Sequence, residues 1–384
     1  MKKTVFIAAL AIVAMASCTK NELKVPSTGT DAVISFQPVV ANATKATYLT
    51  TVNMKDKCTS FGVFAWYPND GGNMQTSTTD ADATLYMDNV KVTYNSSFDD
   101  DTDTGVGTWA PATNYYWPKN GKLSFDAYVP ASAHAASTPG AGKGTFTSDI
   151  QKGLQIADYT VADLANQYDL LYSTRALDKN TSNGGNSGNL TYDGVDIPFN
   201  HALAAIEVKA KTAANYGADV IKLNKVSILY AYNQGKFSQE MSNARTDGTP
   251  KWSNQSNEVE YVLYNAGATL SDGASLSETA LTTPTISNAI LLPQDFDHTA
   301  STGQIVSIKV DYSIKGTNGY LAQTQTFKLN TTSGSEAGGA SAPLSKWEIG
   351  KKYTYTLLFT LEDIHFAPSV ENWTEVTVND IDVK

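Results

Sequence analysis

Short runs of alternating apolar and polar residues recur along almost the whole chain, and they constrain its fold more than any other feature. The runs are rich in Val, Ile, Tyr, Phe and Thr, and Gly, Asn, Asp and Pro separate them. A side-chain period of two is typical of β-strands with one buried face. The predicted strands are residues 32–40, 60–67, 89–94, 122–128, 205–210, 222–230, 259–264, 304–314, 320–329, 353–361 and 375–378.

Helical periodicity is almost absent from the sequence. Only residues 154–164 and 200–205 have a pattern that would allow a turn or two of helix. Parallel sheets need long crossover connections, which are usually helical, so many short strands with few helices favour antiparallel pairing. We therefore predict an all-β fold built from antiparallel β-sandwiches.

Four segments have the composition of long surface loops, namely residues 131–148, 178–189, 243–257 and 331–343. A chain of 384 residues is long enough for two or three domains. Six of the predicted strands precede the loop at 243–257 and five follow it. The expected domains are therefore residues 31–243 and 244–384, with a break near 178–189 as the alternative.

The first eighteen residues have the organisation of a bacterial export signal. Lys2 and Lys3 form a positive start, and residues 5–15 form an apolar core too short to span a bilayer. The sequence Met15-Ala16-Ser17-Cys18 then resembles the lipobox of lipoproteins. We expect residues 1–17 to be removed, Cys18 to carry lipid, and residues 18–30 to act as a tether. The alternative is an ordinary secretory signal with an incidental cysteine.

Composition and charge exclude several classes of function. The formal charge of −10 disfavours nucleic acid as a partner, because phosphate binding needs a clustered basic surface. The chain has only four His and two Cys, which leaves little material for metal or haem chemistry. With Cys18 lipidated, Cys58 has no partner within the chain, and its apolar surroundings predict a buried, unreactive thiol. A structural or binding protein is expected rather than an enzyme, with no cofactor and no metal.

Three local patterns superficially suggest chemistry. Residues 140–145 lack the Gly and Ser/Thr positions of a phosphate-binding loop, which favours an ordinary flexible loop. The acidic run at 99–103 lacks the Gly and Glu of an EF-hand, so a solvated hairpin tip is expected, with an adventitious calcium site as the alternative. His134, His201, His298 and His365 are scattered, and no catalytic motif contains them.

Aromatic residues gather in two parts of the sequence. An exposed set would suit sugar stacking, whereas aromatic residues at strand spacing usually belong to a core or an interface. The core is therefore the favoured interpretation. The residues are Trp66, Tyr67, Trp109, Tyr115, Tyr116, Trp117, Trp347, Tyr353 and Tyr355.

A series of ordered motifs covers nearly the whole chain after the lipobox and Thr44-Lys45-Ala46. They are the segments Phe61-Gly62-Val63-Phe64-Ala65-Trp66, Tyr115-Tyr116-Trp117-Pro118, 121–130, Asp169-Leu170-Leu171-Tyr172, 199–206, Leu291-Leu292-Pro293, 347–355 and the near-terminal Trp373. In this order and spacing the motifs resemble the fimbrillin-like family of Bacteroidetes pilus subunits.

The resemblance implies two transthyretin-like β-sandwich domains and export as a lipoprotein to the outer membrane. It also implies that a protease cuts after a basic residue, removes the first strand and leaves a groove for a strand of another subunit. In this chain the cut is expected between Lys45 and Ala46, and the displaced strand contains Ile34 and Phe36. Lys45 stands where the family often has Arg, so a trypsin-like protease is expected, with Lys55 and Lys57 as competing sites.

The C-terminal segment 375–384 is the expected donor strand. Its apolar residues are Val376, Val378, Ile381 and Val383, with a bulge or bend expected at residues 379–380. The alternative is that this tail closes its own C-terminal sandwich.

The function expected from the sequence is a structural or adhesive subunit of a cell-surface pilus. Its expected partners are other pilus subunits, the outer membrane through Cys18, and a host or glycan receptor. A carbohydrate-binding surface lipoprotein that never polymerises is the alternative.

Overall fold

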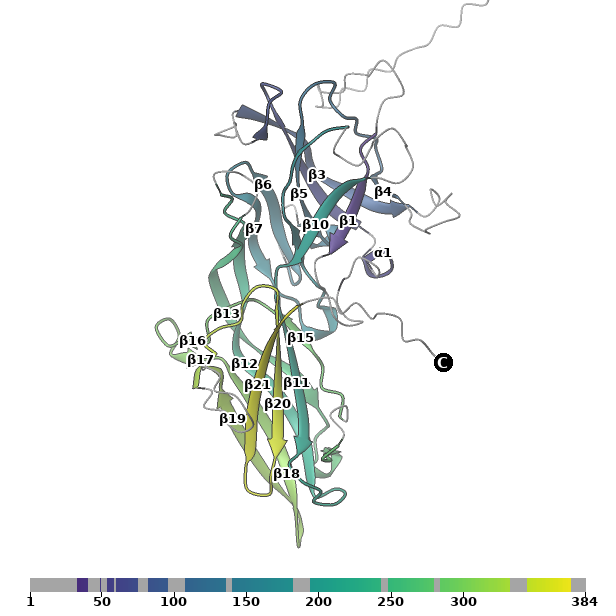
Figure 1. Cartoon of the computed structure of the whole chain (residues 1–384). Helices are drawn as coiled ribbons and strands as arrows, with labels where there is room; N and C mark the ends of the chain where they lie inside the picture. Colours follow the sequence, from purple (N-terminus) through teal and green to yellow (C-terminus); the bar gives the residue numbers. More distant parts are fainter. Residues whose placement is uncertain are drawn as a thin grey trace, which may run out of the picture.

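The structure is a computed structural model that describes residues 33–40, 49, 54–58, 60–74, 82–95, 108–135, 140–181, 194–242, 248–279, 284–331 and 344–373. These residues form two lobes, one above the other in Figure 1. Strands dominate both lobes, and the described α-helix is a single turn, α1 (Met54–Lys57). The all-β prediction is confirmed. Among the described residues, no helix has the length and apolar character needed to cross a bilayer.

The first lobe is an eight-stranded sheet in the order β2-β3-β4-β1-β10-β8-β5-β9. β2 also pairs with β5. All of these strands except β9 therefore form a closed ring of seven around an apolar core. The strands are β1 (Phe36–Val40), β2 (Ser60–Pro68), β3 (Ala83–Asn95), β4 (Thr108–Pro111), β5 (Leu123–Val129), β8 (Leu171–Ser173), β9 (Ala176–Lys179) and β10 (Val195–His201).

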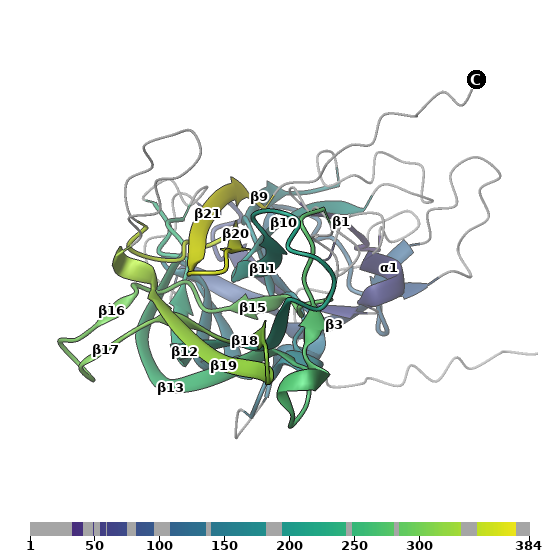
Figure 2. The same ribbon diagram turned by 90° about the horizontal axis from the view of Figure 1, so that it is seen from below.

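The second lobe is a sandwich of two sheets, which Figure 2 shows as separate layers. One layer has the order β15-β11-β20-β21, with β11 (Ala204–Thr212), β15 (Ala289–Leu291), β20 (Lys351–Phe359) and β21 (Ile364–Asn372). The other has the order β19-β18-β12-β7-β6, with β6 (Lys143–Asp149), β7 (Gly153–Thr160), β12 (Ile221–Ser238), β18 (Ser307–Gly316) and β19 (Gly319–Lys328). β13 (Lys251–Asn265) and β14 (Ala274–Ser275) also pair with β12, and β16 (Asp297–His298) pairs with β17 (Gln304–Ile305).

Antiparallel pairing holds for all but two of the described strand pairs. β1 runs parallel to β10, and β11 runs parallel to β20. The expectation of purely antiparallel sheets therefore needs correction. Parallel strands need a long connection, and here the chain between the partners forms most of a lobe instead of a crossover helix.

The local predictions fail where a strand has little apolar sequence of its own. The predicted loop at 131–148 contains most of β6, whose buried side chain is Phe146, and the predicted loop at 243–257 contains the first part of β13. Residues 154–160, considered for a helical turn, belong to β7. β6 and β13 form through pairing with β7 and β12, which the local pattern does not reveal.

The long ribbon of β12 and β13 crosses the expected domain boundary. These strands pair from Lys225↔Asn265 to Ser238↔Lys251, so residue 243 falls between two strands of one hairpin. The chain passes from the first lobe to the second between β10 and β11, at residues 201–204. The β6–β7 hairpin lies between β5 and β8 in the sequence but joins the sheet of the second lobe by pairing with β12.

Candidate assembly site

Strand β1 completes the ring of the first lobe. It runs parallel to β10 over five residue pairs, from Phe36↔Val195 to Val40↔Phe199, and Figure 1 shows the two strands side by side. Inward-facing residues alternate with exposed ones along β1. Ile34, Phe36 and Val40 are at most 3% exposed. The structure therefore places Ile34 and Phe36 on the buried face of one short extended segment.

β1 pairs with β10 over five residues but with β4 at only one residue. Ile34 N–H donates to the Tyr115 carbonyl at 2.8 Å, and Val195 N–H donates to the Ser35 carbonyl at 2.8 Å. Because backbone groups of a strand point alternately to its two sides, the even-numbered residues direct their N–H groups towards β4. Pro38 has no N–H to offer on that side. Within the named strands, β1 and β4 share the single pair Phe36↔Trp109, so β10 provides most of the pairing.

The Phe36 ring fills an aromatic pocket inside the ring of strands. It meets Phe61 and Phe125 edge to face, with ring centroids 6.0 and 5.6 Å apart. Phe61 also packs against Trp109 and Phe199. Burial of a side chain of this size contributes about 1.5–3 kcal/mol. A first lobe without β1 would expose this aromatic floor and the backbone edge of β10.

Gly194 fixes the path of the backbone in this position. A Cβ atom built on Gly194 would lie 2.4–2.6 Å from the backbone N, Cα and C of Phe36, which is closer than atoms can approach. Only glycine permits the two backbones to pack this closely. Any strand that follows the course of β1 must therefore pass directly over Gly194.

Several predicted site residues lie outside the described residues. These are Cys18, Lys45, Ala46, Val376, Val378, Ile381 and Val383. β1 ends at Val40, five residues before Lys45. The competing sites Lys55 and Lys57 are exposed, but they lie within the α1 turn, where Cys58 N–H donates to the Met54 carbonyl at 2.8 Å.

A buried polar cluster lies where the two lobes meet. Asp169 accepts a hydrogen bond from Leu49 N–H at 3.1 Å, and His201 Nδ1 lies 3.0 Å from the same carboxylate. Both side chains are at most 2% exposed. The His201 ring stacks on Trp373, whose backbone N–H donates to the Gly350 carbonyl at 3.0 Å.

This cluster joins three segments that are far apart in the sequence. His201 is the last residue of β10, the strand that pairs with β1. Leu49 lies four residues after Lys45, and Trp373 lies two residues before the segment 375–384. Leu49, the end of β10 and Trp373 therefore meet on the buried pair of Asp169 and His201.

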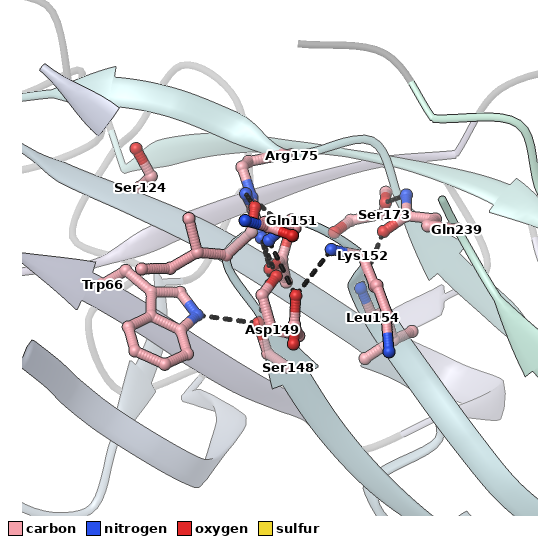
Figure 3. A network of polar contacts seen from close by, with 12 residues as sticks. Trp66, Ser124, Ser148, Asp149, Gln151, Lys152, Leu154, Ser173, Arg175 and Gln239 are labelled. Atoms are coloured by element: carbon pink, nitrogen blue, oxygen red, sulfur yellow. Dashed lines mark hydrogen bonds and ion pairs between the residues drawn. The ribbon is translucent and has the colours of Figure 1, made fainter. Parts of the chain in front are cut away.

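A second buried ion pair ties the groove floor to the second lobe (Figure 3). Arg175 Nε and Nη2 donate to the Asp126 carboxylate at 3.0 and 2.6 Å, and both side chains are completely buried. Nη1 also donates to the Ile150 carbonyl at 2.7 Å, and Nη2 to the Asp149 carbonyl at 2.8 Å. Ser148 Oγ donates to Asp126 at 2.6 Å. β5, which carries Asp126, is thus fastened to the turn between β6 and β7.

Gln239 provides a further connection between the lobes. Its Nε2 donates to the Ser173 carbonyl at 2.5 Å, and its Oε1 accepts from Leu154 N–H at 3.0 Å. Ser173 Oγ in turn accepts from Ala127 N–H at 2.7 Å. Phe125 lines the groove that β1 occupies, and Asp126 follows it on β5. The contacts of Gln239 and Ser173 therefore brace β5, which forms part of the floor of this groove.

The described candidate residues include a buried thiol and no metal-binding cluster. Cys58 is 6% exposed and donates to the Ser60 carbonyl at 3.0 Å, and burial raises the pKa of its thiol to about 11. The buried-thiol prediction is therefore confirmed. The described residues contain no group of three or more His, Cys, Asp or Glu placed to hold a metal ion. Residues 99–103 lie outside the described part of the chain.

The aromatic residues singled out in the sequence are mostly core residues. Six of them are at most 6% exposed: Trp66, Trp109, Trp117, Trp347, Tyr353 and Tyr355. A groove of about 530 Å³ in the second lobe includes Trp252 and Trp347 in its lining, but both indoles are largely buried. These rings therefore stabilise the fold and do not offer open faces to a sugar.

Sequence reasoning assigned no role to Asp126, Asp169, Arg175, Gly194 or Gln239. Asp126 and Asp169 stand within motifs of the family resemblance, as do His201 and Trp373. A signal was therefore present for all members of the Asp169–His201–Trp373 cluster, but for only one member of the Arg175–Asp126 pair. No local pattern marked Arg175, Gly194 or Gln239.

Comparisons with known proteins agree with this architecture. The sequence profile of the Fimbrillin-like family matches residues 42–373. The fimbrium subunit Fim1C of Phocaeicola vulgatus is 23% identical over 404 residues, covering 98% of this chain and 97% of that protein. The crystal structure of a fimbrial protein from Bacteroides vulgatus has a TM-score of 0.59 at 20% identity, covering 89% of this chain and 100% of that chain. The last comparison shows the same fold across both lobes.

Proposed function

Because the chain belongs to the fimbrillin-like family, whose members are structural or adhesive rather than enzymatic, we propose that it polymerises into a pilus by exchanging its first strand. It is a pilus or adhesion subunit of the cell surface. Its proposed partners are other subunits of the same or a related kind, and its proposed route is export as a lipoprotein anchored in the outer membrane through Cys18.

The observation that carries the proposal is the position of β1 in the ring of the first lobe. β1 is short, buries one face, and shares one residue pair with β4. Its departure would leave the β10 edge unpaired and the pocket around Phe36 open. Unpaired strand edges next to exposed apolar surface recruit another strand, because β-augmentation satisfies both.

The structure around the competing sites Lys55 and Lys57 favours Lys45 as the processing site. A protease needs a segment that can enter its active site, and exposed connections between elements meet that need better than hydrogen-bonded turns. Lys55 and Lys57 belong to α1, and buried Met54 and Cys58 flank them. A trypsin-like cut between Lys45 and Ala46 separates β1 covalently from the rest of the chain and leaves the strands of the ring that follow it unbroken.

The tail 375–384 of this chain is the donor strand that enters the groove of a neighbouring subunit. Trp373 is buried and anchored, so the tail begins at a fixed point near the junction of the lobes. Val376, Val378, Ile381 and Val383 supply the apolar side chains that a groove would bury.

The Lys45→Ala variant tests this function, with Lys55→Ala and Lys57→Ala as matched controls. We expect Lys45→Ala to accumulate as an unprocessed lipoprotein and to suppress fibre growth, whereas both controls assemble normally. N-terminal sequencing of surface protein from the unmodified strain should begin at Ala46. Normal fibres formed by Lys45→Ala, or a mature N-terminus elsewhere, would contradict the proposal.

A further inference from the structure

We propose that the groove beneath β1 accepts a donor strand with an aromatic side chain in the position of Phe36, and therefore a strand from a different subunit rather than the tail of a second copy of this chain. The inference rests on the strand exchange proposed above and names the chemistry of the partner.

The pocket around Phe36 is shaped by aromatic rings on two sides. Phe61 and Phe125 both lie nearly perpendicular to the Phe36 ring, with interplanar angles of 83°. Phe36 is 2% exposed, so its ring occupies the pocket almost completely. Protein interiors are packed tightly enough that a smaller side chain leaves a void, because the surrounding structure relaxes only partially.

The backbone of an incoming strand cannot move closer to Gly194 and β10 to compensate for such a void. Gly194 already lies in contact with the backbone of Phe36, where even a Cβ atom would overlap. The pairing of β1 with β10 is also regular over five consecutive residues, without a bulge. The side chain alone must therefore fill the pocket.

The C-terminal tail of this chain does not meet these requirements. Residues 374–384 contain no aromatic residue. Four alternate residues face inwards along residues 34–40, namely Ile34, Phe36, Pro38 and Val40. Every unbroken set of four alternate residues in the tail includes at least one Asp, Asn or Thr.

The apolar set of the tail requires a break in the strand. Val376, Val378, Ile381 and Val383 share one face only if a bulge lies between residues 378 and 381. The regular β10 ladder does not provide for that bulge, and this set also lacks an aromatic ring. The tail thus suits a groove with smaller pockets on another subunit, which predicts assembly in a defined mixed order.

Peptide exchange on the full chain tests the inference. A specific protease site placed after Lys45 leaves β1 bound without a covalent link, and a labelled peptide 32–41 then reports its displacement. The competitors are unlabelled 32–41, the native tail 374–384, the tail with Asp380→Val and Asp382→Val, and the tail with these two substitutions and Val378→Phe. The last two differ only in the side chain of residue 378.

We expect unlabelled 32–41 to displace the label and the native tail to fail. The peptide that also carries Val378→Phe should displace the label at a concentration at least about tenfold lower than the peptide with Asp380→Val and Asp382→Val only, because its aromatic ring fills the pocket. If the two substituted tail peptides displaced the label equally, or if the native tail displaced it as well as 32–41 did, the inference would be overturned. Strand exchange would remain intact in both cases. A groove that does not exchange even 32–41 would overturn strand exchange, and the inference with it.

A second measurement uses the intact chain. Phe36→Val places in the pocket the side chain that the tail would supply, and Val39→Ala is the control because Val39 is 40% exposed on the same strand. The melting temperature should fall for Phe36→Val and remain unchanged for Val39→Ala. An unchanged melting temperature for Phe36→Val would show that the pocket tolerates valine and would overturn the inference.

Discussion

The rings of His201 and Trp373 stack face to face, with centroids 3.9 Å apart and planes within 3° of parallel. His201 ends β10, the strand that pairs with β1, and Trp373 is the last described residue before the C-terminal tail. The stack therefore connects the groove of the subunit with the start of its proposed donor strand. Asp169 holds His201 in place through the hydrogen bond to its Nδ1.

Loss of this stack should destabilise the protein strongly. Trp373→Ala removes a buried indole, and truncations of this kind typically cost about 3–5 kcal/mol in free energy of unfolding. Urea denaturation followed by fluorescence measures the change. Leu361→Ala is the control, since Leu361 is 49% exposed, and it should change stability by less than about 0.5 kcal/mol. Equal stability of the two variants would show that the stack contributes little.

Removal of one partner of the Arg175–Asp126 pair should lower the free energy of unfolding far more than replacement of both partners by apolar residues. Arg175→Met leaves the Asp126 carboxylate buried without its guanidinium, which we expect to cost about 3–5 kcal/mol in free energy of unfolding. Asp126→Leu combined with Arg175→Met removes both charges and should recover much of that loss. The recovery is partial because the Asp149 and Ile150 carbonyls still lose their donor.

Chemical denaturation of both variants and the original protein tests this relation. Arg175→Lys serves as a further comparison, because it keeps the charge but cannot reproduce the two parallel bonds of the guanidinium. A double variant less stable than Arg175→Met would contradict the expected origin of the loss.

The Cys58 thiol should react slowly in the folded protein. Burial raises its pKa to about 11, so almost no thiolate is present at pH 8. In a chain without residues 1–18, Cys58 is the only cysteine. Alkylation at pH 8 should therefore be slow in buffer and fast in denaturant, and Cys58→Ser should give no signal.

The raised pKa of the Cys58 thiol also affects the stability of the protein at high pH. Below an unfolded pKa of about 8.5 the thiol is protonated in both states, and between that value and 11 only the unfolded chain ionises. The thiol should then reduce the free energy of unfolding by up to about 1.4 kcal/mol per pH unit. Cys58→Ala should lack this component. Fast alkylation of the folded protein at pH 8 would show that the thiol is accessible.

Substitution of Cys18 by serine should release the protein from the membrane. The lipobox and the short apolar core predict several acyl chains at Cys18, and a single chain would anchor only weakly. Membrane fractionation and metabolic labelling with a fatty acid measure the change, with Cys58→Ser as the control cysteine. Unaltered labelling and membrane association of Cys18→Ser would disprove the assignment.

Removal of residues 375–384 should separate folding from assembly. The described strands end before this segment, and four aliphatic residues leave with it. The truncated subunit should keep its cooperative melting transition but fail to extend fibres, because burial of each aliphatic residue contributes about 1.5–3 kcal/mol to a neighbour that accepts the strand. Loss of the melting transition in the monomer would instead show that the tail closes its own lobe.

The sequence by itself determined that the chain is an all-β protein, because alternation of apolar and polar residues is a local property. Strands such as β2, β5 and β20 bury apolar residues in quantity, so their segments were predicted without knowledge of their partners. The family resemblance and the buried thiol at Cys58 also followed from sequence alone. β6 was missed because it has one buried apolar side chain, that of Phe146, which is too little to form an alternating pattern. Its pairing with β7 holds it in the sheet instead.

Only the tertiary structure decided which strands meet. Phe36 pairs with Val195 across 159 positions of sequence, and Arg175 reaches Asp126 across 49. Such contacts depend on the closure of the ring and the packing of the lobes, and the residues that form them carry no local mark. Gly194 is the clearest case, since its need for glycine arises only from the backbone of Phe36 against it. Local periodicity specifies strands, whereas long-range packing specifies their neighbours.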